Sequence, residues 1–207
     1  MYRIKNTYRL IPVHPQDRVL QAMRWKGRIY VDPMLPFGLR SAPKIFNTVA
    51  DALNWHLKRS GIPYILHYLD DFIIVAPPDS PLCQCYMDIL MRECFILKVP
   101  IAAHKTDGPT AVIIFLGIII DTLKGELRLP EEKLKRLKDL LREWSGRRSF
   151  VRKELESLIG LLNHACKVVR SGRSFLRRML DLLHAVHHPP NSKTPIRLNA
   201  GFRADLA

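Results

Sequence analysis

The chain has 207 residues, of which 47% are hydrophobic and 25% are charged. This balance provides a sizeable apolar core and argues against wholesale disorder. The 33 Lys and Arg against 19 Asp and Glu give a net charge of +14, which favours polyanions such as nucleic acid. A solvated basic surface is the alternative. Residues 122–178 hold 16 basic and 7 acidic residues, a net of +9, so most of the excess lies in the C-terminal half.

The cysteines and the hydropathy pattern restrict the compartment. Cys83 and Cys85 form a lone CxC pair with no second pair at zinc-ribbon spacing, and Cys94 and Cys166 fall on apolar faces. A reduced environment fits these thiols best. No apolar leader is present, and no apolar stretch approaches the length of a membrane span. We expect an intracellular protein of the cytoplasm or nucleus with no membrane segment.

The first sixty residues predict strands, a loop and a helix. Residues 8–13 predict a short strand, and residues 19–25 and 28–31 predict a hairpin, because a Lys-Gly pair lies between them. The segment 35–43 is rich in Gly and Pro, which is typical of a loop. From 43 to about 60 apolar residues recur at helical spacing. Trp25, like Trp144 later in the chain, is expected to be a packing residue.

The next seventy residues alternate between strands and a helix. Residues 64–67 and 72–76 are apolar runs that predict a buried hairpin, and residues 82–97 predict a helix. The apolar run 111–120 predicts one strand, and 126–129 predicts another after a turn.

The remainder is helical. Pro130 with two following glutamates is a typical helix start, and apolar spacing predicts helices over 130–144, 151–169 and 174–186. The tail 191–207 has no strong signal. Mixed strands and helices followed by helices alone indicate an α+β unit with a helical appendage.

Two adjacent carboxylates, Asp70 and Asp71, lie between the apolar runs of the predicted hairpin. Like charges repel there and both lose water, which is costly unless a cation offsets the cost. Mg²⁺ prefers oxygen ligands, and nucleotidyl transfer uses two such ions about 4 Å apart. An ordinary exposed turn is the alternative for a bare acid pair.

The residues around this pair resemble the reverse transcriptase family. The YLDDFIIV run from Tyr68 resembles its YxDD signature, and LPFGLRSAPKIF from Leu35 resembles its nucleotide- and template-contacting loop and helix. HKT around Lys105 resembles its lysine motif, and FLG at 115–117 resembles its primer-grip hairpin. The segments RKELESLIG and HACKVV most resemble sequences of retrotransposons of the DIRS type.

The resemblance implies a palm with an antiparallel sheet and helices on one face, followed by an all-α thumb. It assigns 1–129 to the palm with a remnant of the fingers, 130–188 to the thumb, and 189–207 to a linker toward an absent RNase H-like domain. It implies Asp70 and Asp71 as catalytic and metal-binding residues for two Mg²⁺ ions. The implied partners are an RNA template, a DNA primer, their hybrid and a dNTP; oligomeric state stays open.

The resemblance also implies contact residues. Nucleotide-binding positions are Tyr8, Gly38 and Lys105. Template- and primer-binding positions lie in the loop, the hairpin tips and the thumb: Leu35, Pro36, Phe37, Gly38, Tyr68, Leu116, Gly117, Arg147, Arg148, Arg152 and Lys153. For the basic thumb residues, a solvated surface is the alternative to phosphate contact.

One departure concerns the first metal-binding Asp of the family, which stands five positions before the aromatic residue matched by Tyr8. Here that position is Arg3, which has no acceptor for a cation and is expected to pair with Asp70 or Asp71. The family's fingers strands are not present before this motif, so we expect the fingers to be largely absent. A decayed copy, a fragment and a retained non-polymerising protein all remain open.

The sequence therefore predicts an RNA-directed DNA polymerase domain of a retroelement, truncated and impaired at Arg3. The alternative is a catalytically silent nucleic-acid-binding remnant or domesticated module.

Overall fold

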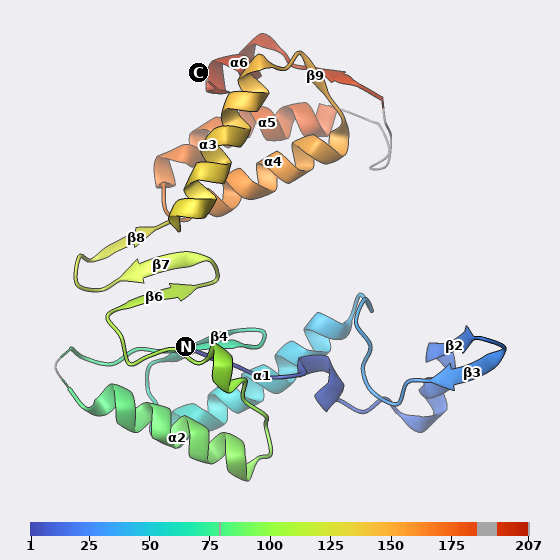
Figure 1. Cartoon of the computed structure of the whole chain (residues 1–207), viewed down its shortest axis with the longest axis vertical. Coiled ribbons are helices and arrows are strands. Elements are labelled where there is room, and N and C mark those ends of the chain that lie inside the picture. Colours follow the sequence, from blue (N-terminus) through green and yellow to red (C-terminus); the bar gives the residue numbers. More distant parts are fainter. Residues whose placement is uncertain (79, 186–193, 207) are drawn as a thin grey trace. The chain divides into compact units, whose positions relative to one another are not determined.

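The computed structural model describes residues 1–78, 80–185 and 194–206 (Figure 1). The chain divides into two compact units, residues 1–115 and 116–207, which we call unit 1 and unit 2. Strands and helices mix in unit 1, whereas helices dominate unit 2. The predicted α+β class is confirmed.

The centre of unit 1 is an antiparallel sheet of three strands in the order β1-β5-β4. The strands are β1 (Tyr2–Arg3), β4 (Ile65–Tyr68) and β5 (Asp71–Ile74). Helices α1 (Ala42–Arg59) and α2 (Leu82–Ile96) pack against β4 and β5 (Figure 1). Along β4 the side chain of Ile65 is buried and that of Leu66 is exposed, so the helices cover one face.

The core of unit 1 forms where the apolar stripes of α1 and α2 meet the covered face of the sheet. It combines residues from both helices and all three strands: Tyr2, Ile4, Phe46, Ala50, Leu53, Leu57, Ile62, Ile65, Phe72, Leu90 and Cys94. Because the sheet is held by this core, the turn between β4 and β5 has a rigid base.

Shorter elements complete unit 1. They are the 3-10 helices η1 (Thr7–Leu10), η2 (Pro15–Gln21) and η3 (Ala103–Lys105), and the strands β2 (Ala22–Trp25), β3 (Arg28–Val31) and β6 (Val112–Phe115). The strand expected over 8–13 is wrong. Asn6 is left-handed with φ 57°, Ile11 N–H donates to the Tyr8 carbonyl, and Pro12 has no N–H for a ladder, so the chain turns instead.

Unit 2 begins with strands β7 (Ile118–Asp121) and β8 (Glu126–Arg128), which pair antiparallel. Helices α3 (Glu131–Gly146), α4 (Arg152–Ala165) and α5 (Arg173–Ala185) follow, with a 3-10 turn η4 (Arg170–Gly172) before α5. The single strand expected over 111–120 is wrong: the run divides into β6 and β7, because Leu116 and Gly117 between them both have positive φ.

The end of the chain belongs to the core of unit 2. Residues 189–193 of the predicted linker lie outside the described residues. From 194 onward, strand β10 (Ile196–Arg197) pairs with β9 (Ser149–Phe150), and α6 (Ala200–Leu206) follows. Ile196, Leu198 and Phe202 are buried with Trp144 and the apolar faces of α4 and α5. Whether this segment leads toward a further domain stays a prediction.

Both expected packing tryptophans can be placed. Trp144 is 2% exposed in the core of unit 2, which confirms that prediction. Trp25 is 63% exposed on β2, so that prediction is wrong. Among the described residues, no helix combines the length and the apolar character that a membrane span requires.

Candidate functional site

The two predicted acids lie at the turn between β4 and β5. Tyr68 and Asp71 are paired across the strands, so Leu69 and Asp70 form a two-residue turn, with Leu69 in the left-handed region at φ 52°. Asp71 is the first residue of β5 and its side chain is 11% exposed, against 34% for Asp70. The structure thus places both carboxylates at the tip of the hairpin.

Arg3 faces these acids from the neighbouring strand. In the β1–β5 register, Arg3 is the Cα partner of Asp71. Its Nε donates to Asp71 Oδ1 at 2.5 Å and its Nη2 donates to Asp71 Oδ2 at 2.8 Å. Asp70 Oδ2 lies 3.8 Å from Arg3 Nε. The expected pairing of Arg3 with the acids is therefore present, and it is bidentate to Asp71.

This pairing has an electrostatic consequence. The hydrogen bond to Asp71, followed by the charges of Asp71 and Asp70, holds the pKa of Arg3 above its usual value, while burial acts against this. The guanidinium remains a cation at any accessible pH. One positive charge thus already lies against both carboxylates.

The donor set does not fit the implied pair of Mg²⁺ ions. Both oxygens of Asp71 accept hydrogen bonds from Arg3. Within residues 1–78, 80–185 and 194–206, no group of three His, Cys, Asp or Glu side chains is placed to hold a metal ion. A guanidinium at this point repels a cation and supplies no ligand. Two carboxylates, one of them engaged, are too few for a two-ion centre.

Tyr8 and the predicted loop lie together. The ring centroid of Tyr8 is 5.2 Å from that of Phe37 and 5.9 Å from that of Phe46 on α1. The loop is held by Leu35 N–H, which donates to the Ile11 carbonyl at 2.8 Å. The structure therefore brings Tyr8, a predicted nucleotide-binding residue, and Phe37 of the predicted loop into one aromatic cluster.

Within that loop the candidate residues differ in exposure. Leu35 is buried, Pro36 is half-buried and Phe37 is 70% exposed. Gly38 has φ 87° with open space around its Cα, a conformation that favours glycine and leaves the backbone accessible.

Lys105 and Tyr68 are both exposed. Lys105 ends η3, which is tied to β1 by a hydrogen bond from Ala102 N–H to the Arg3 carbonyl at 2.9 Å. Tyr68 lies on the open face of the sheet and is 59% exposed. Both side chains are accessible to a ligand, and η3 is fixed to the same strand that carries Arg3.

In unit 2, the candidates Leu116 and Gly117 form a turn that two helices hold. Leu116 has φ 50° and Gly117 has φ 74°. His164 Nε2 on α4 contacts the Leu116 carbonyl at 3.0 Å, and Lys133 Nζ on α3 donates to the Gly117 carbonyl at 3.3 Å. Sequence reasoning missed Lys133 and His164, because no local pattern links them to a turn in another segment.

The four basic thumb candidates separate into two kinds. Arg147 is bound to Glu143 at 2.5 Å and Glu154 at 3.0 Å, and Arg152 is bound to Glu156 at 2.8 Å. Arg148 and Lys153 are exposed and form no ion pair with any residue that the structure describes. The second pair is therefore better suited to phosphate contact than the first.

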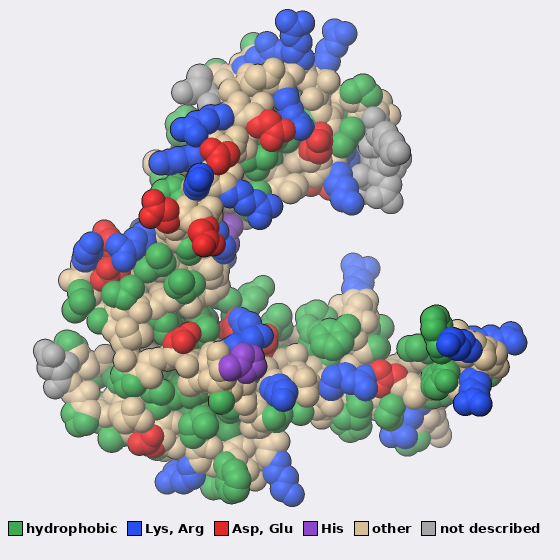
Figure 2. Space-filling model, viewed as in Figure 1, with side chains coloured by type: hydrophobic (Ala, Val, Ile, Leu, Met, Phe, Trp, Pro, Cys, Tyr) green, Lys and Arg blue, Asp and Glu red, His purple; other side chains and the backbone are tan. Residues whose placement is uncertain are grey.

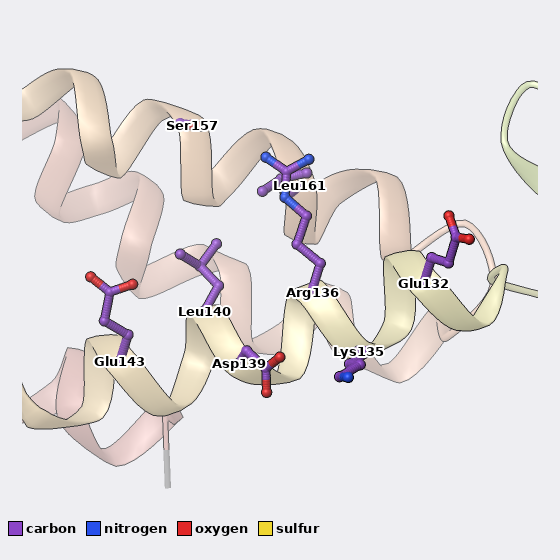
Figure 3. Close-up of a pocket in the computed structure, with 8 residues that line it drawn as sticks. All are labelled: Glu132, Lys135, Arg136, Asp139, Leu140, Glu143, Ser157 and Leu161. Carbon is purple, nitrogen blue, oxygen red and sulfur yellow. The ribbon is translucent and has the colours of Figure 1, made fainter.

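An open groove between α3 and α4 does not fit a polyanion (Figure 3). It is lined by three acids, two bases and three other residues: Glu132, Asp139, Glu143, Lys135, Arg136, Leu140, Ser157 and Leu161. Because acids outnumber bases there, we assign it no role in binding nucleic acid.

Comparisons with known proteins agree with the motifs. The Pro-Pol polyprotein of feline foamy virus is 27% identical over 164 residues, covering 78% of this chain and 13% of that protein. The enzymatic polyprotein of Cestrum yellow leaf curling virus is 25% identical over 164 residues, covering 77% of this chain and 24% of that protein. The chain thus spans at most about a quarter of these relatives.

Solved structures share the fold. The foamy viral protease-reverse transcriptase dRH in complex with ds DNA matches 99% of this chain and 33% of its own, with a TM-score of 0.70 and 20% identity. The match to the foamy viral protease-reverse transcriptase in complex with an RNA/DNA hybrid covers 99% of this chain and 25% of that chain. Its TM-score is 0.66 and the sequence identity is 19%.

The family model described as "Reverse transcriptase (RNA-dependent DNA polymerase)" matches residues 3–120. This match covers more than half of the 207-residue chain, so the chain belongs to the reverse transcriptase family.

Proposed function

We propose that this chain is the palm and thumb portion of an RNA-directed DNA polymerase of a retroelement, and that Arg3 impairs its nucleotidyl transfer. Palm and thumb correspond to 1–129 and 130–188 in this proposal. The bidentate contact of Arg3 with Asp71 is the observation that carries the impairment. Membership of the family and the shared fold support the polymerase origin. The DIRS-type affiliation stays a prediction.

In this proposal the palm positions a primer end and a nucleotide beside the β4–β5 turn. Tyr8 contacts the sugar of the dNTP and Gly38 allows close approach of the backbone. Lys105 binds phosphate. The family generally relies on divalent metal ions, which assist the attack of a primer 3′-hydroxyl on the α-phosphate. Since the donor set here does not fit two ions, no catalytic step follows for the unmodified chain.

The thumb binds the template–primer duplex by contacting the sugar-phosphate backbone of the nucleic acid. The net charge of +9 over 122–178 favours this partner, and Arg148 and Lys153 are the exposed bases that contact phosphate. Each neutralised phosphate contributes a salt-dependent share of the affinity. The solved relatives in complex with dsDNA and with an RNA/DNA hybrid make RNA template, DNA primer and their hybrid the natural partners to test.

The deciding experiment measures hybrid binding and primer extension on the same preparations. The chain and its Arg3→Asp variant are titrated with a labelled RNA/DNA hybrid at several salt concentrations, and then supplied with dNTPs and Mg²⁺. We expect salt-sensitive binding by both and extension by Arg3→Asp alone, with a gain on the order of 10³-fold. Arg3→Lys is the matched control, because it keeps the positive charge and restores no carboxylate.

Three results would count against the proposal. Extension by the unmodified chain would overturn the impairment. Hybrid binding that is weak and insensitive to salt would overturn the polymerase-derived thumb. Hybrid binding without extension in either variant would overturn Arg3 as the cause and favour the alternative, a catalytically silent binding module.

A further inference from the structure

Strands β2 and β3 form a two-stranded ribbon that extends from the rest of unit 1 (Figure 1). All eight of their residues are exposed. In an antiparallel pair, residues opposite each other share a face, and successive residues alternate between faces. Met23 lies opposite Tyr30 and Trp25 lies opposite Arg28, so these four side chains form one face, which we call the aromatic face.

The aromatic face presents large flat side chains to solvent. Met23, Trp25 and Tyr30 are 59%, 63% and 47% exposed. Lys26 at the turn lies with its Nζ 6.0 Å from the centroid of the Trp25 ring. The cation lies over one face of this exposed indole, so a planar partner would stack on the other face.

The charge of the ribbon restricts the class of partner. Residues 22–31 contain Arg24, Lys26 and Arg28 and no acid, and Figure 2 shows basic and hydrophobic side chains side by side on these strands. The neighbouring acid Asp32 already accepts hydrogen bonds from Arg9 and from Met34 N–H. Lys26 and Arg28 both lie next to Trp25, and cations beside exposed aromatic rings suit a polyanion that has planar groups.

We propose that the aromatic face of the β2–β3 ribbon is a binding surface for single-stranded nucleic acid. Bases stack on Trp25 and Tyr30, while Lys26 and Arg28 contact the phosphates on either side. The surface is independent of the Asp70–Asp71 turn and of polymerase activity. Stacking is tolerant of sequence, so the surface has little preference among bases.

The opposite face provides a matched control. It carries Ala22, Arg24, Ile29 and Val31, and has no aromatic side chain. Ile29 is 72% exposed, more than Trp25. Removing Ile29 therefore takes a similarly exposed apolar side chain from the same ribbon without touching the stacking residues.

The test uses the full chain and a fluorescent single-stranded oligonucleotide of mixed sequence, with an RNA/DNA hybrid titrated in parallel. We expect Trp25→Ala and Tyr30→Ala each to raise the dissociation constant for the single strand roughly 5- to 100-fold. Ile29→Ala is expected to change it less than twofold, and the hybrid affinity is expected to stay unchanged in all three variants. Quenching of tryptophan fluorescence by the oligonucleotide, measured with Trp55→Phe as the starting variant and reduced by the further change Trp25→Phe, is a second readout.

Two results would overturn the assignment. One is a single-strand affinity in Trp25→Ala and Tyr30→Ala that equals that of the unmodified chain. The other is sedimentation showing self-association that Trp25→Ala abolishes at unchanged single-strand affinity, which would assign the face to a second copy of the chain. Because hybrid binding is measured separately, either failure leaves the proposed function standing.

Discussion

Arg3 and Asp71 lie opposite each other on the antiparallel strands β1 and β5, and the guanidinium of Arg3 donates to both carboxylate oxygens of Asp71. This register places a cation next to the turn at the position where the resemblance to the family implies a metal-binding Asp. The strands therefore hold an internal ion pair where a metal site is expected. An ion pair stabilises the turn without any bound metal, and this difference is measurable.

Replacing Arg3 by Asp is expected to convert a metal-independent turn into a metal-dependent one. Three carboxylates close together repel, so Arg3→Asp is expected to unfold at a lower temperature than the unmodified chain in EDTA. Mg²⁺ at ten times its dissociation constant then restores about 1.4 kcal/mol of stability to the variant. Thermal unfolding with and without Mg²⁺ measures both effects.

The unmodified chain is expected to show no Mg²⁺-dependent shift in that measurement. Arg3→Asp combined with Asp71→Asn is the control, since it removes one of the three ligands and with it most of the shift. An equal shift in the unmodified chain would show that Mg²⁺ binds elsewhere.

The parts of the fold that local periodicity determines were predictable from the sequence. The apolar residues Phe46, Leu53 and Leu57 recur at helical spacing, and α1 buries all three. The acid pair between two apolar runs predicted the β4–β5 hairpin, and Tyr68 and Asp71 are paired as that prediction requires. In these segments the local pattern and the tertiary packing agree.

Other parts depend on contacts that no local pattern shows. The run 111–120 is uniformly apolar, so periodicity alone gave no reason to break it at Leu116. Residues 196–206 lack a strong signal because the partners of the buried side chains Ile196, Leu198 and Phe202 lie far away in the sequence. Lys133 and His164 likewise contact the 116–117 turn only because α3 and α4 fold over it.

Gly117→Ala is expected to destabilise unit 2 for two reasons. Its φ of 74° is unfavourable for alanine by about 1–2 kcal/mol. A Cβ at this position would also lie 1.9 Å from Lys133 Nζ, so the lysine must move and give up its hydrogen bond to the Gly117 carbonyl. The loss adds about 1 kcal/mol. Urea unfolding measures the sum.

Gly125→Ala separates the two contributions. Gly125 has a similar φ of 65°, but a Cβ there meets open space, so this variant carries the backbone cost alone. In a Lys133→Ala background, Gly117→Ala is expected to cost no more than Gly125→Ala. A larger cost in that background would assign the extra destabilisation to something other than Lys133.

Glu93 is expected to give unit 1 an acid-sensitive contact between α1 and α2. Its carboxylate lies 2.8 Å from His56 Nε2 and 2.9 Å from Arg92 Nη2. The hydrogen bonds from His56 and then Arg92 hold the pKa of Glu93 below its usual value, against the effect of burial. Because the pKa is lower in the folded chain, the stabilisation is present above the unfolded value of about 4.3 and is lost as the pH falls through the folded value.

The measurement is thermal unfolding of Glu93→Gln from pH 7 down to pH 3. We expect the variant to be less stable than the unmodified chain at pH 7, with a difference that shrinks below about pH 4.3. Asp88→Asn is the control, since Asp88 is an exposed carboxylate on the same helix. A difference for Glu93→Gln that is constant with pH would mean that lost packing, not lost charge, is responsible.

Phe202 tests whether the end of the chain is part of the folded unit 2. Its side chain is 0% exposed, and its ring centroid lies 6.0 Å from those of both Trp144 and Phe150. Truncating a buried phenylalanine removes its transfer free energy and leaves a cavity, so Phe202→Ala is expected to cost about 3–5 kcal/mol. Phe175→Ala is the control, because Phe175 is 53% exposed on α5 and its loss is expected to change stability by roughly 0.5 kcal/mol or less.

Trp144 belongs to the same aromatic cluster, so in a background with Trp25→Phe and Trp55→Phe the fluorescence during urea unfolding reports on unit 2. A cost of Phe202→Ala no larger than that of Phe175→Ala would show that residues 194–206 do not stabilise the helices. In that case they would be the linker that the sequence first suggested. The expected large cost would instead mean that a stable unit 2 needs the segment that carries Ile196, Leu198 and Phe202, since its removal would leave Trp144 and Phe150 exposed to water.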